Sequence, residues 1–272
     1  MNLLIYQGDE LDAAGRLLLP PGDRRLVHVA TVLGLKAGAR LRVGRLQGPR
    51  GWGRLGADPD PARPCLLDVE PDDEPTGARH AIPPGPQRVL VLALPRPPAL
   101  RRLLQLAPQL ELDRVLIVRS ARVEKSYLHS PLLSSGEWRR HLLLGLEQAM
   151  TTRLPEVLLF ERFRPFVEEA LPRFLPSRGL CLLPHPGPDP GPAAWAGRVA
   201  GRPWTLAVGP EGGWLDDELE QLGAAGFERL CLGPRILRVE AAVQRLVAQM
   251  DLLAELEGGL GQAGQEPRNG HE

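Results

Sequence analysis

The spacing of apolar and polar residues divides the chain into two regions. In the first, residues 40–46, RLRVGRL, alternate the two kinds at a period of two, and a further short run, CLLDVE, occupies 65–70. Alternating runs between glycine-containing breaks are typical of strands with one buried face. They predict a small β-barrel. VHVATVLG (27–34) fits either another short strand or a helix that ends at Gly34.

In the second region, short runs rich in valine and leucine alternate with helical patterns. The predicted strands lie at 88–95, 113–120, 156–163, 179–186, 204–210 and 228–234. Continuous apolar runs of this length are typical of strands buried on both faces of a sheet. The predicted helices lie at 97–112, 134–154, 166–175, 215–227 and 239–257, the fourth with Asp216 or Asp217 as its cap. This alternation predicts an α/β domain with a largely parallel sheet.

A segment rich in proline and acidic residues separates the two regions. Residues 71–87, PDDEPTGARHAIPPGPQ, suit neither a helix nor a central strand, because proline fixes φ and lacks an N–H donor. We therefore predict a first domain at 1–72, a linker at 73–87 and a second domain at 88–257. The remaining residues, 258–272, have little to bury and are predicted to be disordered.

The composition is that of a soluble globular protein. The 272 residues, 43% apolar and 24% charged, are enough for two domains with buried cores. No run is long enough to cross a bilayer or to act as a signal peptide, which predicts a cytoplasmic location. Three cysteines without a paired spacing argue against a disulfide framework or a structural zinc site, and no metal is predicted.

The net charge is zero, but the charges are segregated. Basic and acidic residues number 9 and 4 in residues 1–55 and 11 and 5 in 88–154, but 2 and 7 in 56–87 and 11 and 17 in 155–272. Nearly all the basic residues are arginine, whose planar guanidinium binds phosphates with two parallel hydrogen bonds. Two basic segments therefore favour a polyanionic partner. A genome-wide preference for arginine over lysine is the alternative explanation of the arginine content.

Three of the predicted strands end in unusual loops. GPEGGW follows the run at 204–208, LGPRILR follows the run at 228–232, and LLPHP (182–186) resembles them. In open α/β sheets, ligands lie beyond the carboxyl ends of the strands. Glycine lets the backbone approach a ligand, and free main-chain groups in such a loop pair with the edge of a base. The loops therefore indicate a ligand site, with a purely structural strand-to-helix turn as the alternative.

Two stretches near the end of the chain carry a resemblance to a known family. GPEGGWLDDE (209–218) and LGPRILRVEAA (232–242) together resemble the paired signature of the RsmE family, methyltransferases of uridine N3 in 16S ribosomal RNA. HVATVLGLKAGARLRV (28–43) and LEQAMTTRLPEV (146–157) are more weakly similar to that family's PUA-like barrel motif and its central helix end. The resemblance implies a SPOUT-type α/β domain with a trefoil knot, preceded by a PUA-like β-barrel. It also implies S-adenosylmethionine as cofactor, ribosomal RNA or the small ribosomal subunit as partner, and a homodimer.

The same resemblance assigns residues to the cofactor. Main-chain groups of three segments would hold the adenine, and the glycines would leave room for it. The residues implied are Leu183, Pro184, His185, Gly209, Pro210, Glu211, Gly212, Gly213, Leu232, Gly233, Ile236, Leu237 and Arg238. Arg238 is also the catalytic candidate, either stabilising the developing uridine anion or binding a phosphate, with an ion pair to Glu240 or Glu211 as the alternative. Glu211 either braces its loop or takes part in the chemistry.

Residues on the RNA side are implied by the resemblance and by their positions. They are His28, Arg42, Arg45, Arg50, Arg54, Arg122, Gln148 and Arg153. Arginines on the barrel strands suit phosphate contacts, with a solvated surface as the alternative. Trp52 either stacks on a base or anchors a turn, and His28 either faces RNA or is simply packed in an apolar run.

Several positions depart from the family pattern. Gly34 stands where the barrel motif usually has arginine, LAPQLE (106–111) replaces a polar helix segment, and Thr151 replaces an arginine. Pro108 is expected to kink its helix. The cofactor loops match while the RNA-side residues do not, so three functions stay open. They are the family's reaction with compensating arginines such as Arg122, Arg139 and Arg140, methylation of another RNA, and RNA binding without catalysis.

Overall fold

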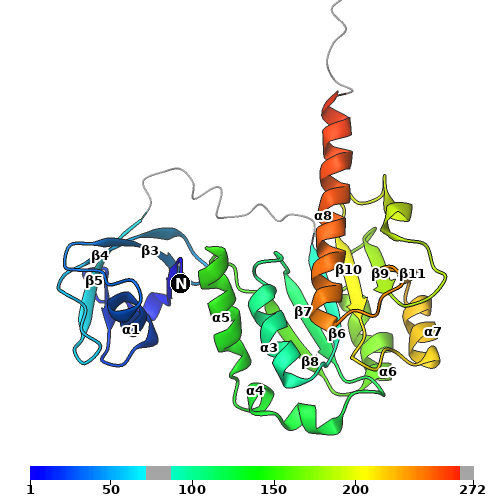
Figure 1. Cartoon of the computed structure of the whole chain (residues 1–272), viewed down its shortest axis with the longest axis horizontal. Helices are drawn as coiled ribbons and strands as arrows, with labels where there is room; N and C mark the ends of the chain where they lie inside the picture. The colour runs from blue at the N-terminus through cyan, green and yellow to red at the C-terminus, as the bar shows by residue number, and fades with distance from the viewer. Residues whose placement is uncertain (72–86, 264–272) are drawn as a thin grey trace, which may run out of the picture. The chain divides into compact units, whose positions relative to one another are not determined.

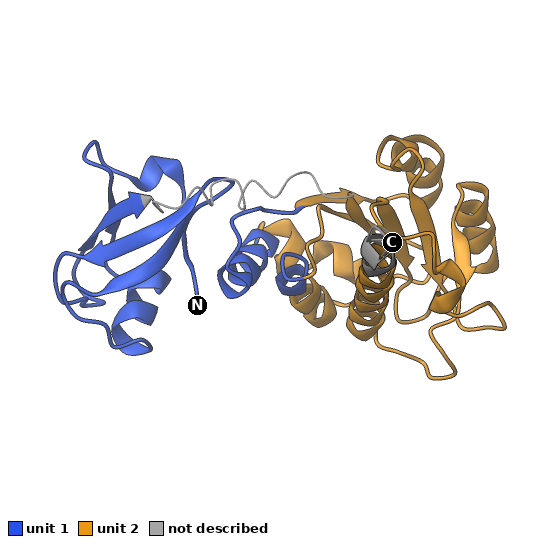
Figure 2. Ribbon diagram, turned by 90° about the horizontal axis from the view of Figure 1, so that it is seen from above, with its two compact units in different colours: residues 1–84, 104–109, 137–155 blue, residues 85–103, 110–136, 156–272 orange. Residues whose placement is uncertain are grey.

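A computed structural model describes residues 1–71 and 87–263 (Figure 1). The chain forms two compact units, which are coloured separately in Figure 2. Unit 1 comprises residues 1–84, 104–109 and 137–155, and unit 2 comprises residues 85–103, 110–136 and 156–272. Two segments predicted for the second domain thus belong to unit 1. The predicted linker, 73–87, lies outside the described residues except for Gln87.

Unit 1 contains a mixed five-stranded sheet. Its strands are β1 (Leu4–Tyr6), β2 (Arg16–Leu19), β3 (Arg40–Arg45), β4 (Arg50–Leu55) and β5 (Cys65–Pro71), in the order β1-β3-β4-β5-β2. β1 runs parallel to β3, and the other neighbours are antiparallel. The predicted alternation is present, because Leu41 and Val43 are buried whereas Arg40 is exposed. Leu17, Leu19 and other apolar side chains form the core on the buried face.

The segment at 27–34 lies in a helix and its exit, not in a strand. Helix α1 (Arg24–Thr31) begins at Asp23, whose carboxylate accepts a 2.7 Å hydrogen bond from the main-chain amide of Arg25. Leu26, on its apolar face, is fully buried. The chain leaves the helix through Gly34, where φ is +60°, a conformation that glycine adopts without strain.

The later helix α5 (Trp138–Ala149) completes unit 1. Its Glu147, 1% exposed, accepts hydrogen bonds from both terminal nitrogens of the Arg24 guanidinium. A Cβ on Gly145 would lie 2.3 Å from the carbonyl oxygen of Gln105, so only glycine permits this approach of the two backbones. These contacts explain why residues 104–109 and 137–155 belong with the N-terminal sheet.

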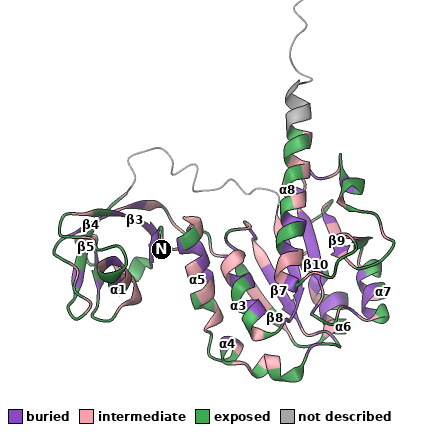
Figure 3. Ribbon diagram, viewed as in Figure 1, coloured by how far each residue is buried: buried purple, intermediate pink, exposed green. Residues whose placement is uncertain are grey.

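Unit 2 is built on a six-stranded sheet. Its strands are β6 (Arg88–Ala93), β7 (Arg114–Val118), β8 (Glu156–Phe160), β9 (Leu180–Pro184), β10 (Trp204–Val208) and β11 (Glu228–Leu230), in the order β11-β9-β10-β6-β7-β8. All neighbours are parallel, so all carboxyl ends lie at one edge. β10 is buried along its whole length and β6 nearly so, whereas the edge strand β8 is partly exposed (Figure 3). Burial on both faces is what the continuous apolar runs predicted.

The helices of unit 2 follow the predicted order with different bounds. They are α3 (Pro97–Leu106), α4 (Pro131–Ser134), α6 (Phe163–Pro165), α7 (Asp216–Ala224) and α8 (Val239–Ala263), with the end of α3 in unit 1. The predicted helix at 166–175 is replaced by a π-helical and a 3-10 turn that end at Arg173. α8 contacts β10 and buries Val243, Leu246 and Met250.

Two predictions about the helix ends are wrong. α8 continues to Ala263, so residues 258–263 of the predicted disordered tail are helical, while 264–272 lie outside the described residues. α7 is not capped by Asp216 or Asp217. Instead, the carboxylate of Glu218 accepts a 2.9 Å hydrogen bond from the main-chain amide of Leu215, the residue that precedes the helix. In residues 1–71 and 87–263, no helix is both long and apolar enough to cross a membrane.

Candidate functional site

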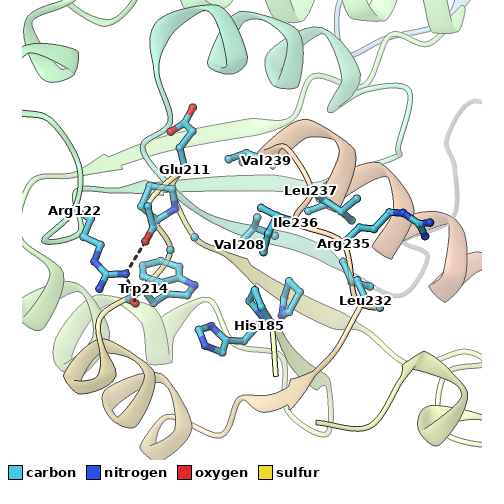
Figure 4. Close-up of a pocket in the computed structure, with 18 residues that line it drawn as sticks. Arg122, His185, Val208, Glu211, Trp214, Leu232, Arg235, Ile236, Leu237 and Val239 are labelled. Carbon is cyan, nitrogen blue, oxygen red and sulfur yellow. Dashed lines mark hydrogen bonds between the residues drawn. The ribbon is translucent and has the colours of Figure 1, made fainter. Parts of the chain in front are cut away.

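A pocket of about 400 Å³ lies at the carboxyl edge of the parallel sheet in unit 2 (Figure 4). Its walls come from the loops after β9, β10 and β11, together with Arg122 from the loop after β7 and the start of α8. This volume is within the range typical of small-molecule sites. Parallel strands bring their carboxyl ends to one edge, which is why segments distant in sequence meet here.

Most residues predicted to bind the cofactor line this one pocket. They are Pro184, His185, Gly209, Pro210, Glu211, Gly212, Gly213, Leu232, Gly233, Ile236 and Leu237. Leu183 does not line it, because its side chain is fully buried in β9. Lining residues that sequence reasoning did not select include Val208, Trp214 and Arg235. Trp214 directly follows the glycine loop, and that adjacency was the only signal that pointed to it.

The loop after β10 is compact because of its glycines. The amide of Gly213 donates a 2.8 Å hydrogen bond to the carbonyl of Pro210, and Gly213 has φ of +71°, which other residues adopt only with strain. A Cβ on Gly209 would lie 3.2 Å from the Trp214 ring. One on Gly212 would lie 3.3 Å from Cδ of Arg122. Each of the three glycines in GPEGG therefore has its own conformational or packing reason.

Two arginines hold this loop. Nη1 of Arg122 donates a 2.6 Å hydrogen bond to the carbonyl oxygen of Gly212, drawn as a dashed line in Figure 4. Oε1 of Glu211 forms an ion pair with Nε of Arg96, at 3.2 Å, and accepts a 3.3 Å hydrogen bond from the Arg96 main-chain amide. Glu211 thus braces the loop, and Figure 4 shows its carboxylate pointing away from the pocket.

A buried carboxylate ties the loops after β7 and β10 together. Glu218, 5% exposed, accepts hydrogen bonds from the main-chain amides of Ala121 (2.7 Å) and Leu215 (2.9 Å). Ala121 precedes Arg122, so Glu218 also fixes the backbone that carries this arginine. The sequence contained the local signal, a glutamate three residues after Leu215, but the capping rule favoured the neighbouring aspartates.

The third wall is an extended loop between β11 and α8. Gly233 has φ of +106°, a conformation that L side chains rarely adopt. Ile236 lines the pocket yet is 80% exposed. Within the described part of the chain, the main-chain amides of Ile236 and Leu237 have no hydrogen-bond partner. Unpaired amides that border a pocket are available to a ligand.

Arg238 does not line the pocket. It is exposed at the residue before α8, and neither proposed ion pair forms. Oε1 of Glu240 accepts a 2.7 Å hydrogen bond from Arg102, and Glu211 pairs with Arg96. The arginines that line the pocket are Arg122, from the loop after β7, and Arg235, from the loop after β11; Arg122 also donates a hydrogen bond to the carbonyl oxygen of Gly212.

The predicted RNA-side residues fall in unit 1, apart from Arg122. Nε2 of His28 lies 3.3 Å from the N-terminal amine, and burial together with that positive charge lowers the pKa of His28. Arg50 donates to the carbonyl of Met150 at 2.7 Å, and Arg54 to that of Gly38 at 3.4 Å. Arg45, Gln148 and Arg153 are exposed.

Trp52 lies between two arginines on the sheet of unit 1. The guanidinium of Arg42 lies 4.5 Å from the Trp52 ring centroid and that of Arg40 lies 4.7 Å from it. The attraction of a cation to the negative face of the ring holds all three side chains together. Trp52 is directly opposite Arg42 in the β3 and β4 pairing, so it belongs to a strand and does not anchor a turn.

Comparisons with known proteins agree with this fold. Residues 83–251 match the family described as RNA methyltransferase domain. Ribosomal RNA small subunit methyltransferase E of Treponema pallidum is 30% identical over 246 residues, which cover 89% of this chain and 87% of that protein. The protein of the same name from Mycobacterium tuberculosis is 27% identical over 265 residues, covering 89% and 88%.

A solved structure shows the same architecture. Ribosomal RNA small subunit methyltransferase E from Neisseria gonorrhoeae, bound to S-adenosyl methionine, superposes with a TM-score of 0.67 at 20% identity, covering 94% of this chain and 98% of that one. The expected fold, a SPOUT-type α/β domain after a barrel-like domain, is confirmed. Because the family match spans most of the chain and the Treponema relative nearly all of it, the chain belongs to the RNA methyltransferases, in the RsmE family of small-subunit ribosomal RNA methyltransferases.

Proposed function

We propose that this chain transfers a methyl group from S-adenosylmethionine to N3 of a uridine in 16S ribosomal RNA. The observation that carries the proposal is the meeting of three strand-end loops around one pocket at the carboxyl edge of the unit 2 sheet. The names of the relatives describe methylation of ribosomal RNA of the small subunit, and the Neisseria protein holds S-adenosyl methionine.

The residues of the pocket fit this cofactor. Its adenine needs hydrogen-bond donors and acceptors at its edge, and the unpaired amides of Ile236 and Leu237 border the pocket. Nε1 of Trp214, a further pocket residue, is buried and has no partner among the described residues, so it is available as a donor. Gly212 and Gly213 carry no side chain that would fill the space between the walls.

When bound, the cofactor supplies an electrophilic methyl group on a sulfonium sulfur. The chain has therefore mainly to orient the uridine and to favour loss of its N3 proton. An arginine beside the developing negative charge stabilises it, and we assign this role to Arg122, which lines the pocket. Arg238, exposed just before α8, is proposed to contact a phosphate of the RNA instead.

The partner under this proposal is the small ribosomal subunit in the cytoplasm, and the active form is a homodimer. Support for a dimer comes from apolar side chains that are exposed to solvent in the single chain. Ile236 beside the pocket is 80% exposed, and Leu252 and Leu256 on α8 are 54% and 57% exposed. Contact with a second copy would remove this apolar surface from water.

Calorimetric titration with S-adenosylmethionine tests the pocket. We expect the wild-type chain to bind and Gly212→Val to lose binding, because a branched side chain there meets Cδ and Cβ of Arg122, which lie 3.3 and 3.4 Å from the first added carbon. Gly223→Val is the matched control, since nothing lies within 4 Å of its Cβ position. Equal affinities of the two variants would contradict the assignment of this pocket.

Transfer of labelled methyl groups to small ribosomal subunits then tests the reaction. The RNA is digested and the labelled nucleoside is identified by mass spectrometry. We expect 3-methyluridine. Another methylated nucleoside would favour the second candidate, a changed RNA target, which the altered residues Gly34 and Thr151 suggest. Cofactor binding without transfer to any RNA would instead favour an RNA-binding protein that has lost catalysis.

A further inference from the structure

Two arginines border the third wall of the pocket, the loop between β11 and α8. Arg235 belongs to this loop and lines the pocket. Arg245 belongs to α8, and its guanidinium lies against the same loop, because a Cβ on Gly233 would be 3.6 Å from its Nη2 and 3.9 Å from its Nη1. Both arginines are exposed. Two positive charges thus border one short loop.

Neither charge is neutralised in the described part of the chain. In residues 1–71 and 87–263, the side chains of Arg235 and Arg245 form no hydrogen bond or ion pair. The acid nearest to both in sequence, Glu240, pairs with Arg102 at 2.7 Å. On α8, the positions three and four residues before and after Arg245 hold alanine or glutamine, so no carboxylate lies beside it on its own helix.

Other arginines at the site differ in this respect. Arg122 donates a hydrogen bond to the carbonyl oxygen of Gly212, and Arg96 forms an ion pair with Glu211. An arginine keeps its proton in a protein, so two unpaired guanidiniums at one loop repel each other until an anion binds beside them. The third wall therefore offers a place for an anion.

We propose that Arg235 and Arg245 bind one phosphate group of the RNA strand that carries the target uridine. This inference rests on the proposed function and adds to it a contact that holds the strand beside the cofactor. The planar guanidinium matches a phosphate, which accepts two parallel hydrogen bonds from it. Phosphate contacts fix the position of a nucleic acid without reading its sequence.

The position of the loop suits this role. An enzyme that modifies a base takes the nucleotide out of the stack, and the backbone on both sides of that nucleotide stays outside the pocket. Arg235 lines the pocket and is exposed, so it is accessible to the backbone. Figure 4 shows Arg122 and Arg235 at opposite ends of the pocket. A phosphate at Arg235 therefore leaves Arg122 available for its proposed role beside the base.

The arrangement favours a phosphate of RNA over the carboxylate of the cofactor. Arg235 lines the pocket, whereas Arg245 does not. An anion that contacts both side chains therefore lies beyond the pocket wall. A polymer whose nucleotide enters the pocket places a phosphate there, whereas a small cofactor is held inside the pocket.

Binding to unmethylated small ribosomal subunits tests the contact with the full-length protein. The variants are Arg235→Gln, Arg245→Gln, the double variant and Arg235→Lys. Arg101→Gln is the control, because Arg101 is an exposed arginine of α3 that does not line the pocket. For each protein, the Kd for subunits is measured by filter binding at several KCl concentrations with S-adenosylhomocysteine present. The Kd for S-adenosylmethionine is measured by calorimetry.

We expect each glutamine variant to bind subunits about tenfold more weakly, the loss typical of a hydrogen bond from a charged donor. Because both arginines hold one anion, the loss in the double variant should be at least about threefold smaller than the product of the two single losses. The double variant should also lower the slope of log Kd against log [KCl] by about 0.7, the value for one phosphate of a single strand.

Two further results separate a phosphate contact from other roles. Arg235→Lys should keep the salt slope, because the charge remains, and still weaken binding, because an ammonium group does not pair with two oxygens in parallel. The Kd for S-adenosylmethionine should stay within about twofold of that of Arg101→Gln in all variants.

The opposite results would overturn the site. They are a double variant whose subunit Kd lies within about twofold of that of Arg101→Gln, or one whose salt slope equals that of the control. A cofactor Kd weakened about tenfold in Arg235→Gln would assign this arginine to the carboxylate of the cofactor, which also overturns the site. A wild-type protein that binds subunits but transfers no methyl group would overturn the proposed reaction alone, because the phosphate contact is measured by binding.

Discussion

Replacing Glu218 by glutamine changes one charge at the point where two loops of the site are joined. The carboxylate is 5% exposed and accepts hydrogen bonds from the amides of Ala121 and Leu215, one on each oxygen. A glutamine side chain keeps the shape but has only one acceptor oxygen. Its NH2 group must face the other amide, and two donors cannot bond each other.

The size of the effect follows from these two bonds. The amide that loses its acceptor is left buried and unpaired, which costs about 1–3 kcal/mol. The remaining bond loses its charge assistance, which costs about 1 kcal/mol more. We therefore expect Glu218→Gln to destabilise unit 2 by about 3 kcal/mol. If about 1.4 kcal/mol of this destabilisation is local to the two loops that the cofactor needs in place, the affinity for S-adenosylmethionine drops about tenfold.

Urea unfolding and hydrogen exchange measure the two consequences separately. Exchange should speed up at the amides of Ala121 and Leu215, and the midpoint of unfolding should fall. Glu220→Gln is the matched control, because Glu220 is exposed on the same helix. If Glu218→Gln and Glu220→Gln differ by less than about 0.5 kcal/mol, with equal exchange at both amides, the carboxylate does not join the loops and the reasoning fails.

Two further predictions concern unit 1. Gly145→Ala should destabilise unit 1 by about 2–3 kcal/mol in urea unfolding. The new Cβ would lie 2.3 Å from the carbonyl oxygen of Gln105, whereas the closest ordinary contact between a carbon and an oxygen is about 3.3 Å. Gly223→Ala is the control: it has open space around its Cβ position and should be neutral or stabilising. Burial opposes ionisation of Asp23, but hydrogen bonds and the charge of Arg25 outweigh it and lower the pKa of Asp23. A carboxyl whose pKa is lowered in the folded state stabilises fully above its unfolded pKa of about 3.9, and this contribution is lost as the pH falls through the folded value. Wild-type stability should thus drop more than that of Asp23→Asn between about pH 5 and 2, and equal drops would contradict this.

The strands of unit 2 were predictable because the apolar residues within each strand indicate by themselves that the strand is buried. β10 is buried at every position, and β6 at all but its first, as an unbroken apolar run requires in a sheet covered on both faces. The predicted runs are two to four residues too long at their carboxyl ends. Some of those extra residues, such as Gly209 after β10, are already part of the loops that line the pocket.

The division of the chain was less predictable, because it depends on contacts between distant residues. Helix α5 has an apolar face, and that pattern alone does not say which sheet the face meets. Membership of unit 1 depends on the approach of Gly145 to Gln105 and on the ion pair of Glu147 with Arg24, 123 residues apart in sequence. No local signal predicts such a pair.

Arg122 and Arg238 show the same limit. Arg238 was selected because it follows a loop with a recognisable pattern, and glycine loops are recognisable because positive φ demands glycine at the position itself. Which arginine contacts the glycine loop depends instead on the order of the strands in the sheet. β7 is separated from β10 only by β6, so the loop after β7 brings Arg122 to the carbonyl of Gly212. Arg238 is exposed and does not line the pocket, although its neighbours Leu237 and Val239 do. A backbone requirement depends on one residue, but the partner of a side chain across a parallel sheet is decided only when the order of the strands is known. For this reason a glycine can be selected from the sequence alone, whereas the contact of Arg122 with Gly212 needs the structure.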